Sequence, residues 1–205
     1  MPWHELAALG AATCWALTGV LAAGPAAELG ALSFNRWRQI FALAMFAVMG
    51  IAMAANLFTL FVFYEVLTFA TYPLVTHAGT PAARRGARIY LVTLVGASVL
   101  LLLPGIIGVQ SVVGSTTFAQ GGLLSGRVDD VTGSALLLLL VFGAAKAALM
   151  PLHGWLPNAM VAPAPVSALL HAVAVVKAGV FTVLKISAYI FGPDLIATLS
   201  SATWI

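Results

Sequence analysis

Three charged residues, Glu65, Lys146 and Lys177, lie inside long apolar runs of the sequence. On membrane-insertion scales, a charge at the centre of a membrane span costs about 2.5 to 3.5 kcal/mol, so its presence there indicates a function. A carboxylate and an amine whose separation changes inside a membrane load and release a proton, because each group alters the proton affinity of the other. These residues therefore indicate proton transfer across a membrane, with a fixed structural ion pair between Glu65 and Lys146 as the alternative.

Glu65 begins a narrow polar stripe. Thr68, Tyr72 and Thr76 follow it at steps of three, four and four residues, which places all four side chains on one face of a helix. On an otherwise apolar helix, this stripe predicts a hydrated pathway in which Thr68 and Tyr72 organise water. The simpler alternative is a protonated Glu65 that makes one hydrogen bond to a neighbouring helix.

Two histidines extend this pattern. His171 lies six residues before Lys177, which corresponds to about 9 Å along a helix and about 120° around it, so the two side chains line adjoining walls of one aqueous track. The intrinsic pKa of histidine suits a proton relay, and a histidine with its partners inside the core is the alternative for His171. His153 follows Pro151 at a helix break and is the candidate gate or organiser of water.

Composition places the whole chain in a membrane. Of its 205 residues, 62% are hydrophobic and 7% are charged, whereas a soluble domain carries about 25% charged residues. The basic residues do not gather into an exposed patch, which argues against nucleic-acid binding. A single cysteine, Cys14, excludes an intrachain disulfide. The histidines lack metal-ligand spacing and the sequence has no nucleotide-binding pattern, so we expect no metal and no cofactor on this chain.

The apolar runs predict an all-α, multi-pass membrane protein. The run from about 39 to 76 is too long for one span and is predicted to form two helices hinged near Asn56. Pro151 is predicted to interrupt the helix that holds Lys146 and to make it discontinuous. The other predicted segments are a span at 6–23, a polar connection with Arg36 and Arg38, a loop with Arg84, Arg85 and Arg88, a span at 89–109 kinked at Pro104, a loop at 110–132, a broken stretch at 153–165, and a span at 166–190 from which Lys185 reaches for the membrane surface.

The basic residues also predict an orientation. Arg36 and Arg38 precede the second span and the three arginines at 84, 85 and 88 follow the third, so both groups fall on one side of the membrane. The positive-inside rule makes that side cytoplasmic, which leaves the N-terminus and the loop 110–132 outside.

Two long motifs resemble one known family. The stretch 143–172, GAAKAALMPLHGWLPNAMVAPAPVSALLHA, is similar to the signature of the antiporter-like subunits of respiratory complex I (NADH-quinone oxidoreductase chains L, M and N, and NADH dehydrogenase chain 5) and of the large A-type and D-type subunits of multisubunit cation/proton antiporters. Upstream, NLFTLFVFYE at 56–65 and TYPLVTHAGT at 71–80 resemble the glutamate helix of the same family. The motifs stand in the family's order and cover about residues 51–205.

The resemblance implies roles and a fold for residues 51–205. Glu65 corresponds to the glutamate of a half-channel, Lys146 to the lysine of the discontinuous helix, and His171 and Lys177 to the relay towards the channel centre. The fold implied is a bundle of two inverted helical repeats, of which this chain is expected to hold the first, with the second beyond Ile205. The implied partners are other hydrophobic membrane subunits, which would carry any redox cofactor, and the coupled ion is H⁺ alone or also Na⁺ or K⁺.

Residues 1–50 form a separate prediction. ATCWALTGV at 12–20 and SFNRWR at 33–38 resemble the first two helices of drug/metabolite-type transporters, so we expect two N-terminal transmembrane helices there. Two further functions therefore stay open beside proton translocation within a larger complex. They are a small secondary transporter of drugs or metabolites, and a truncated, non-conducting membrane scaffold. In each case we expect an integral, multi-pass protein of a bacterial plasma membrane.

Overall fold

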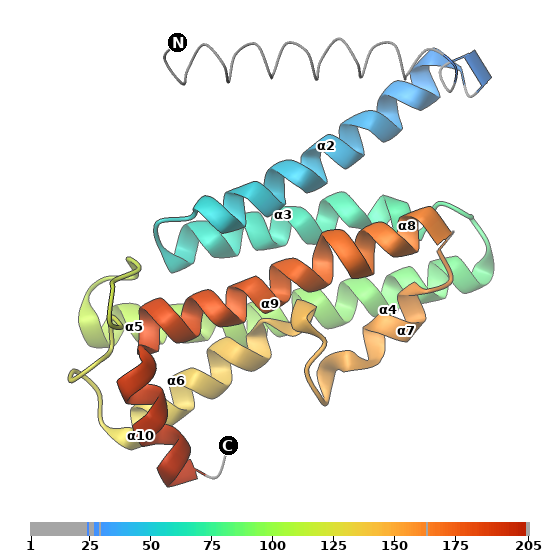
Figure 1. The fold of residues 1–205 in the computed structure, drawn as a ribbon. Helices are drawn as coiled ribbons and strands as arrows, with labels where there is room; N and C mark the ends of the chain where they lie inside the picture. The colour runs from blue at the N-terminus through green and yellow to red at the C-terminus, as the bar shows by residue number, and fades with distance from the viewer. Residues whose placement is uncertain (1–23, 25–26, 29, 163, 204–205) are drawn as a thin grey trace, which may run out of the picture. The chain divides into compact units, whose positions relative to one another are not determined.

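Every regular element in the described part of the chain is helical. The structure, a computed structural model, describes residues 24, 27–28, 30–162 and 164–203. The chain divides into two compact units, Met1–Ala42 and Leu43–Ile205, and the boundary in the sequence falls within the helix α2 (Ala31–Met53). Within the described residues, the segments long and apolar enough to cross a membrane are 32–53, 57–75, 81–113 and 166–191, and 130–143 is a shorter apolar helix (Figure 1). The predicted all-α, multi-pass membrane fold is confirmed.

The described part of the first unit contains the beginning of α2. Arg36 and Arg38 lie inside this helix because it begins at Ala31, so the predicted polar connection is wrong at these positions. The Arg38 guanidinium donates a hydrogen bond to the Asn35 side chain over 2.9 Å and is thereby held against its own helix. The predicted span at 6–23 lies outside the described residues.

The predicted hinge at Asn56 separates α2 from α3 (Leu57–Val75). Asn56 is the N-cap of α3: its backbone is extended, and its side-chain oxygen accepts a hydrogen bond from the Thr59 N–H over 2.7 Å. Such a cap stabilises the helix start because it satisfies an N–H group that has no partner within the helix. Beyond the hinge the two helices touch through Phe46 and Phe63, whose ring centroids are 5.6 Å apart.

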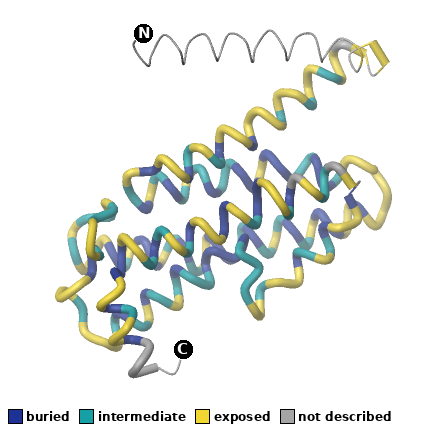
Figure 2. The backbone as a smooth tube through the Cα atoms, in the orientation of Figure 1, coloured by how far each residue is buried: buried dark blue, intermediate teal, exposed yellow. Residues whose placement is uncertain are grey.

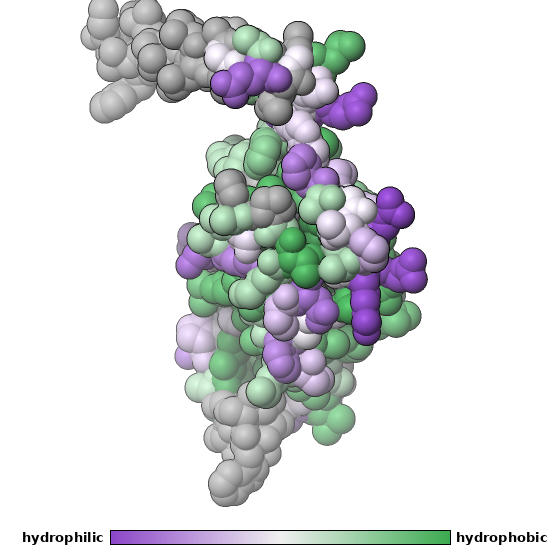
Figure 3. Space-filling model, turned by 90° about the vertical axis from the view of Figure 1, so that its right-hand side faces the viewer, coloured by the Kyte–Doolittle hydropathy of each residue, from purple (hydrophilic) through white to green (hydrophobic). Residues whose placement is uncertain are grey.

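Helix α4 (Pro81–Ala97) begins earlier than predicted. Thr80 caps it by accepting a hydrogen bond from the Ala83 N–H over 3.1 Å, and Pro81 occupies the first turn, where no N–H is needed. The three arginines at 84, 85 and 88 are therefore exposed residues of a helix, and the prediction of a loop at these positions is wrong. The end of the molecule at which α3 ends and α4 begins shows hydrophilic side chains among apolar ones (Figure 3).

The helix then continues from Pro81 to Val113 through α4, a π-helical turn η1 (Ser98–Leu102) and α5 (Leu103–Val113). The π turn lies directly before Pro104, whose ring has no N–H for the carbonyl four residues earlier. The irregularity predicted at Pro104 therefore takes the form of a wide turn within one long helix. The helix ends at Gly114, whose left-handed backbone has a φ of 73°.

A hydrogen-bonded loop, 114–129, follows and is shorter at both ends than the predicted loop. Its backbone N–H groups at Leu123 and Leu124 donate to the carbonyls of Tyr189 and Ile190 over 3.1 and 2.8 Å. The next helix, α6 (Asp130–Gly143), has Asp129 as its N-cap. Hydrogen bonds from the side chain and the backbone N–H of Thr132 hold the pKa of the exposed Asp129 carboxyl below its ordinary value.

The chain breaks directly after α6. Ala144 leaves the helical backbone with a ψ of 46°, Lys146 lies in a 3₁₀ turn, η2 (Ala145–Ala147), and Ala148 has a left-handed backbone with a φ of 56°. The helix is discontinuous as predicted, but the break begins at Ala144, before Pro151, so Lys146 lies in the break itself. The short helical pieces that follow are η3 (Leu152–Gly154), α7 (Trp155–Ala159), α8 (Ala164–Ala168) and the π turn η4 (Leu169–Val173).

The last long segment consists of α9 (Val175–Ile186) and a π turn, η5 (Ser187–Phe191), and a further helix, α10 (Pro193–Thr203), follows that the sequence did not predict. Within the second unit, α4 packs on α3 and α7, and α9 packs on η2. Buried positions lie on the sides of these helices that face one another, and exposed positions lie outside (Figure 2). The break that holds Lys146 is thus enclosed between long helices.

Candidate functional site

Lys146 is completely buried and is held against Tyr64 of α3 by three contacts. Its Nζ donates to the Tyr64 carbonyl over 2.8 Å and lies 3.2 Å from the centroid of the Tyr64 ring. The Lys146 backbone N–H donates to the Tyr64 hydroxyl over 2.9 Å. An ammonium group over an aromatic ring in a desolvated site gains about 2 kcal/mol, so the ring and the carbonyl together replace part of the water that this cation has lost.

Glu65 follows Tyr64 directly and is not paired with Lys146. One carboxylate oxygen, Oε1, is buried and has no hydrogen-bond partner among the described residues. No ion pair joins Glu65 and Lys146 within the described part of the chain. Neither the fixed ion pair nor the single interhelical hydrogen bond that the sequence left open is therefore formed.

The threonine hydroxyls of the polar stripe on α3 donate hydrogen bonds to backbone carbonyls of the same helix. Thr68 is buried, and its hydroxyl donates to the same Tyr64 carbonyl that accepts from Lys146, over 3.3 Å. Thr76 is half-buried and donates to the Pro73 carbonyl over 3.1 Å, while Tyr72 is half-buried. Of the predicted water-organising residues, Thr68 therefore lies directly beside the Lys146 acceptor.

Trp155, at the start of α7, ties the break to the surrounding helices. Its indole N–H donates to the Ala145 carbonyl over 2.9 Å, which fixes the residue before Lys146. Its ring packs edge-on against Tyr90, with centroids 5.5 Å apart. The Tyr90 hydroxyl in turn shares a hydrogen bond of 2.6 Å with Thr71 of α3. None of these three side chains stands out in the sequence as a candidate.

His171 stacks on the other side of this group, in the π turn η4. Its ring lies nearly parallel to that of Trp155, with centroids 6.4 Å apart and an interplanar angle of 26°. Both ring nitrogens are buried and have no hydrogen-bond partner among the described residues. The alternative of a core histidine with its partners satisfied is therefore wrong, and a π turn at such a residue is a frequent feature of functional sites.

Lys177 and His153 are not brought into this cluster. Lys177 is exposed on α9, and His153 is exposed in η3. The predicted relay thus has its first member, His171, beside Trp155 and its second member on the surface of the second unit. The gate assigned to His153 stays a prediction.

Gly179 of α9 allows the helix to lie directly on the break. A Cβ at this position would overlap the backbone of Lys146 and Ala147, so no larger residue fits without a shift of one backbone or the other. The close approach explains why α9 packs on η2 and how Lys146 loses all contact with solvent.

Lys185 lies on the same helix but has a different environment. Its Nζ donates to the carbonyls of Ala54, Ala52 and Ile51 over 2.7, 2.9 and 3.4 Å, so it caps the C-terminal end of α2. That it reaches for the membrane surface stays a prediction, and in the structure its amine is held by the carbonyls at this helix end.

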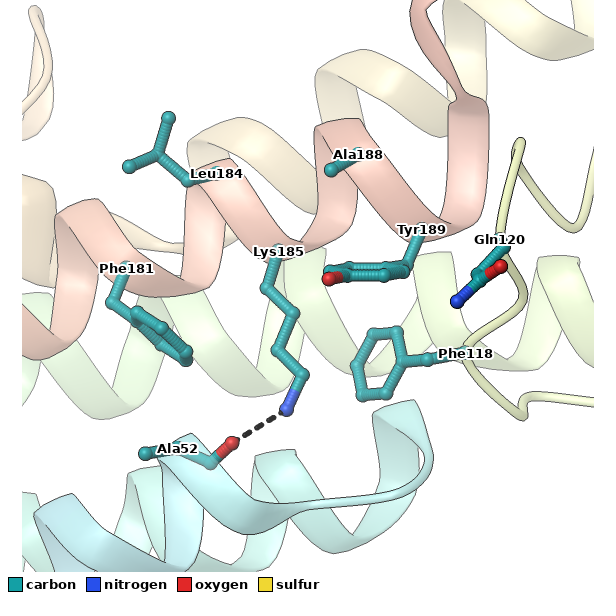
Figure 4. A pocket seen from close by; sticks show the side chains of 8 residues that line it. All are labelled: Ala52, Phe118, Gln120, Phe181, Leu184, Lys185, Ala188 and Tyr189. Atoms are coloured by element: carbon teal, nitrogen blue, oxygen red, sulfur yellow. Dashed lines mark hydrogen bonds between the residues drawn. The ribbon is translucent and has the colours of Figure 1, made fainter.

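Lys185 also lines an open pocket of about 570 Å³ (Figure 4). Aromatic side chains from α9, η5 and the loop 114–129 surround the amine, and the Phe118 ring centroid lies 4.6 Å from Nζ. The lining residues are Ala52, Phe118, Gln120, Phe181, Leu184, Lys185, Ala188 and Tyr189. The contacts of Lys185 with three carbonyls hold this lysine at the α2–α3 hinge.

The cluster around Lys146 combines three kinds of proton-binding group in apolar surroundings. They are an ammonium, a carboxylate with an unpartnered oxygen and an imidazole with two unpartnered nitrogens. No group of three or more His, Cys, Asp or Glu residues within the described ranges is placed to hold a metal ion. Each of these groups is of a type that binds and releases protons in proteins.

Comparisons with known proteins agree on one family. The family described as NADH:quinone oxidoreductase/Mrp antiporter, transmembrane, matches residues 54–204. A protein of Rhizobium meliloti, named as the probable A/B component of a K⁺/H⁺ antiporter, is 36% identical over 155 residues, which are 73% of this chain and 15% of that protein. NAD(P)H-quinone oxidoreductase chain 5 of Synechocystis sp. is 35% identical over 165 residues, which are 76% of this chain and 24% of that protein.

A solved structure shows the same fold. The membrane-bound sulfane sulfur reductase, described as an archaeal respiratory membrane complex, contains a chain that superposes with a TM-score of 0.71 at 25% sequence identity. The match covers 82% of this chain and 35% of that chain. This chain therefore corresponds to a limited part of each of the larger proteins that it resembles.

Proposed function

This chain belongs to the NADH:quinone oxidoreductase/Mrp antiporter transmembrane family, and on that premise we propose that it translocates protons as one subunit of a larger membrane complex. The complex is a redox-driven pump of the NADH:quinone oxidoreductase type or a multisubunit cation/proton antiporter. The observation that carries the proposal is the position of Lys146, which is completely buried, bound to Tyr64 and next to an unpaired Glu65. A charge held in this way inside a membrane span is costly and marks an ion pathway.

The proton step takes place between Glu65 and Lys146. A protonated Glu65 meets a neutral Lys146, the proton passes from the carboxylic acid to the amine, and a carboxylate and an ammonium group remain. Movement of Lys146 from Glu65 back to Tyr64 separates the two charges and keeps the proton on the lysine. The unpaired arrangement of Lys146 and Glu65 supports such a separated state.

The onward path uses the remaining predicted residues. His171 takes the proton from Lys146 through water, because its two nitrogens are buried and free of other hydrogen bonds in the described structure. Lys177, exposed on α9, passes the proton on towards a partner subunit. Thr68 and Tyr72 order the water between these groups, and His153, exposed in η3, acts as a gate at the surface of the second unit. Hydrophobic partner subunits complete the complex, and Na⁺ or K⁺ is the exchanged ion in the antiporter form.

Proton flux into proteoliposomes tests this proposal. The purified chain is reconstituted with a pH-sensitive dye inside the vesicles, and a membrane potential is imposed with K⁺ and valinomycin. We expect a flux that Glu65→Gln and Lys146→Met each reduce by about 10²-fold or more, the usual contribution of a group that transfers a proton. The matched control is Glu28→Gln, which makes the same change at an exposed glutamate and leaves the flux as it is.

Two outcomes contradict the proposal. A flux that survives both Glu65→Gln and Lys146→Met assigns the proton path to other residues. A folded wild-type chain without flux favours the non-conducting scaffold. Repeating the experiment with a Na⁺ or K⁺ gradient in place of the imposed potential distinguishes an antiporter from a simple proton path.

A further inference from the structure

We propose that Tyr64 is the positioning residue of the proton step. It holds Lys146 away from Glu65 except when the proton passes between them. This inference rests on the proposed function, because it states how the Glu65–Lys146 pair is kept apart. The two ends of the same tyrosine act on the same lysine: the backbone carbonyl and the ring hold the ammonium, and the hydroxyl holds the Lys146 backbone.

The carbonyl and the ring of Tyr64 compete electrostatically with Glu65 for the Lys146 ammonium group. An ammonium and a carboxylate in a medium of low dielectric attract each other strongly, so a neighbouring lysine and glutamate form an ion pair unless something competes. In the structure the competitor is Tyr64, whose ring face and carbonyl both present negative potential to Nζ at 3.2 and 2.8 Å. Glu65 is left with a buried oxygen that has no partner among the described residues, although Lys146 is bound to the residue directly before it.

The geometry of the turn anchors the Lys146 backbone. Lys146 lies in a 3₁₀ turn between two breaks of the helical backbone, so its backbone N–H is free for the Tyr64 hydroxyl over 2.9 Å. Gly179 and the Trp155 indole fix the same turn from the other sides. The backbone of Lys146 is therefore anchored, and its side chain has only to swing from the Tyr64 carbonyl to the next residue along α3. In this proposal the Tyr64 carbonyl and the Glu65 carboxylate are the two alternative acceptors of one anchored side chain.

The sequence offers a direct spectroscopic test. The chain contains three lysines, at 146, 177 and 185, four tyrosines and three glutamates, so selective isotope labels give few signals. Solid-state NMR on the reconstituted full chain, with ¹⁵N on lysine Nζ and ¹³C on the tyrosine carbonyls, measures the contact between Lys146 and Tyr64. We expect dipolar dephasing of one lysine signal, absent in Lys146→Met, and no dephasing of any lysine by ¹³Cδ-labelled glutamate.

Removal of the ring is expected to release the lysine. In Tyr64→Leu, Lys146 moves to Glu65, a lysine–glutamate contact appears, and Glu65→Gln in the same background removes it. Tyr64→Phe keeps the ring and the carbonyl but removes the hydroxyl that accepts from the Lys146 backbone N–H, so we expect the contact between Lys146 and residue 64, labelled on its carbonyl, to persist and the proton flux to fall less than in Tyr64→Leu. Tyr64→Leu reduces the flux about ten-fold or more, since a desolvated cation–π contact is lost.

Tyr90→Leu is the matched control. It removes an equally buried tyrosine ring from the same unit, next to Trp155, and leaves the Tyr64–Lys146 contacts in place. We expect it to lower stability without creating a lysine–glutamate contact. A Tyr90→Leu spectrum with that contact would show that any loss of packing frees Lys146, and would overturn the specific role of Tyr64.

The spectra and the flux separate the two proposals. Absence of the lysine–tyrosine contact in the wild type, or a Tyr64→Leu spectrum identical to wild type, overturns the role of Tyr64 even if protons flow. Spectra as expected in a chain that conducts no protons support the role of Tyr64 in holding the lysine and contradict the proposed function. Should Tyr64→Leu not fold, the wild-type contact and Tyr64→Phe decide the question.

Discussion

Lys146, in the helix break, and Lys185, on α9, both belong to the second unit and both donate to backbone carbonyls of an earlier helix, but their environments are opposite. Lys185 is half-buried and binds three carbonyls at the C-terminal end of α2, where the helix dipole favours a cation. Lys146 has no exposed surface and binds one carbonyl in the middle of α3, where that carbonyl is already engaged by its own helix. Lys185 is a satisfied structural cation, and Lys146 is an under-compensated one.

The comparison shows that a charge in a membrane span is a functional signal only after its partners are counted. The three carbonyls and the dipole at the C-terminal end of α2 replace most of the water around the Lys185 ammonium group. We therefore expect Lys185 to stay in this position. One carbonyl and one ring replace the hydration of Lys146 only in part, and Glu65, the residue after Tyr64 on α3, has a buried oxygen without a partner among the described residues. This difference in partners is the basis for proposing Lys146, and not Lys185, as the functional charge.

The largest expected effect on stability comes from crowding the Lys146 turn. Gly179→Ala places a Cβ against the backbone of Lys146 and Ala147, and overpacking of this kind costs about 1 to 3 kcal/mol. We expect a lower unfolding temperature in detergent by circular dichroism, and a lost proton flux in the fraction that folds. The control Gly96→Ala has open space around its Cβ, and an equal loss there would contradict the close approach.

A smaller loss is expected from removing the cap on α2. Lys185→Met deletes the charge that binds the α2 carbonyls, and a cation at a helix C-terminus contributes up to about 2 kcal/mol in a partly buried geometry. We expect the unfolding temperature to fall and the flux per folded molecule to stay the same. Loss of flux in a folded Lys185→Met protein would place this lysine in the proton pathway, and Lys185 and Lys146 would then not differ in role.

The smallest effect on stability is expected at Asp129, an exposed helix cap outside the site. Asp129 caps α6, and its hydrogen bonds to Thr132 hold its pKa below the ordinary value. A carboxyl with a lowered pKa in the folded state stabilises that state when ionised, so the contribution is present at neutral pH and is lost as the pH falls through the lowered pKa. Asp129→Ala is therefore expected to lower the unfolding temperature slightly at neutral pH and to match wild type in acid, with Asp129→Ser retaining the cap.

Sequence alone is sufficient to find the charged members of the site, because Glu65 and Lys146 are costly in an apolar run whatever their geometry. The hinge at Asn56 is also readable, since a helix cannot span twice the thickness of a membrane. Thr80 followed by Pro81 is a common sequence signal for the start of a helix, and α4 begins there. The prediction of a loop at this point gave more weight to the three charged arginines than to this signal.

Other features depend on contacts that a single sequence does not encode locally. Tyr64 and Trp155 are aromatic residues in apolar runs, where packing is the common explanation, and only the fold brings their polar atoms to Lys146 and Ala145. In the sequence, Gly179 does not differ from other glycines of a membrane helix. Its importance is seen only in the fold, where α9 packs directly on the break. The exposed position of Lys177 likewise follows from the rotation of α9, which a spacing of six residues from His171 does not fix.

The most direct test of the account is the proton flux of Lys146→Met and Lys185→Met measured side by side in proteoliposomes, per folded molecule. We expect Lys146→Met to lose the flux by about 10²-fold or more while its stability stays equal or rises, because an under-compensated buried charge is replaced by an apolar side chain. We expect Lys185→Met to conduct as wild type does. Equal flux in the two variants would contradict the assignment of the proton step to Lys146.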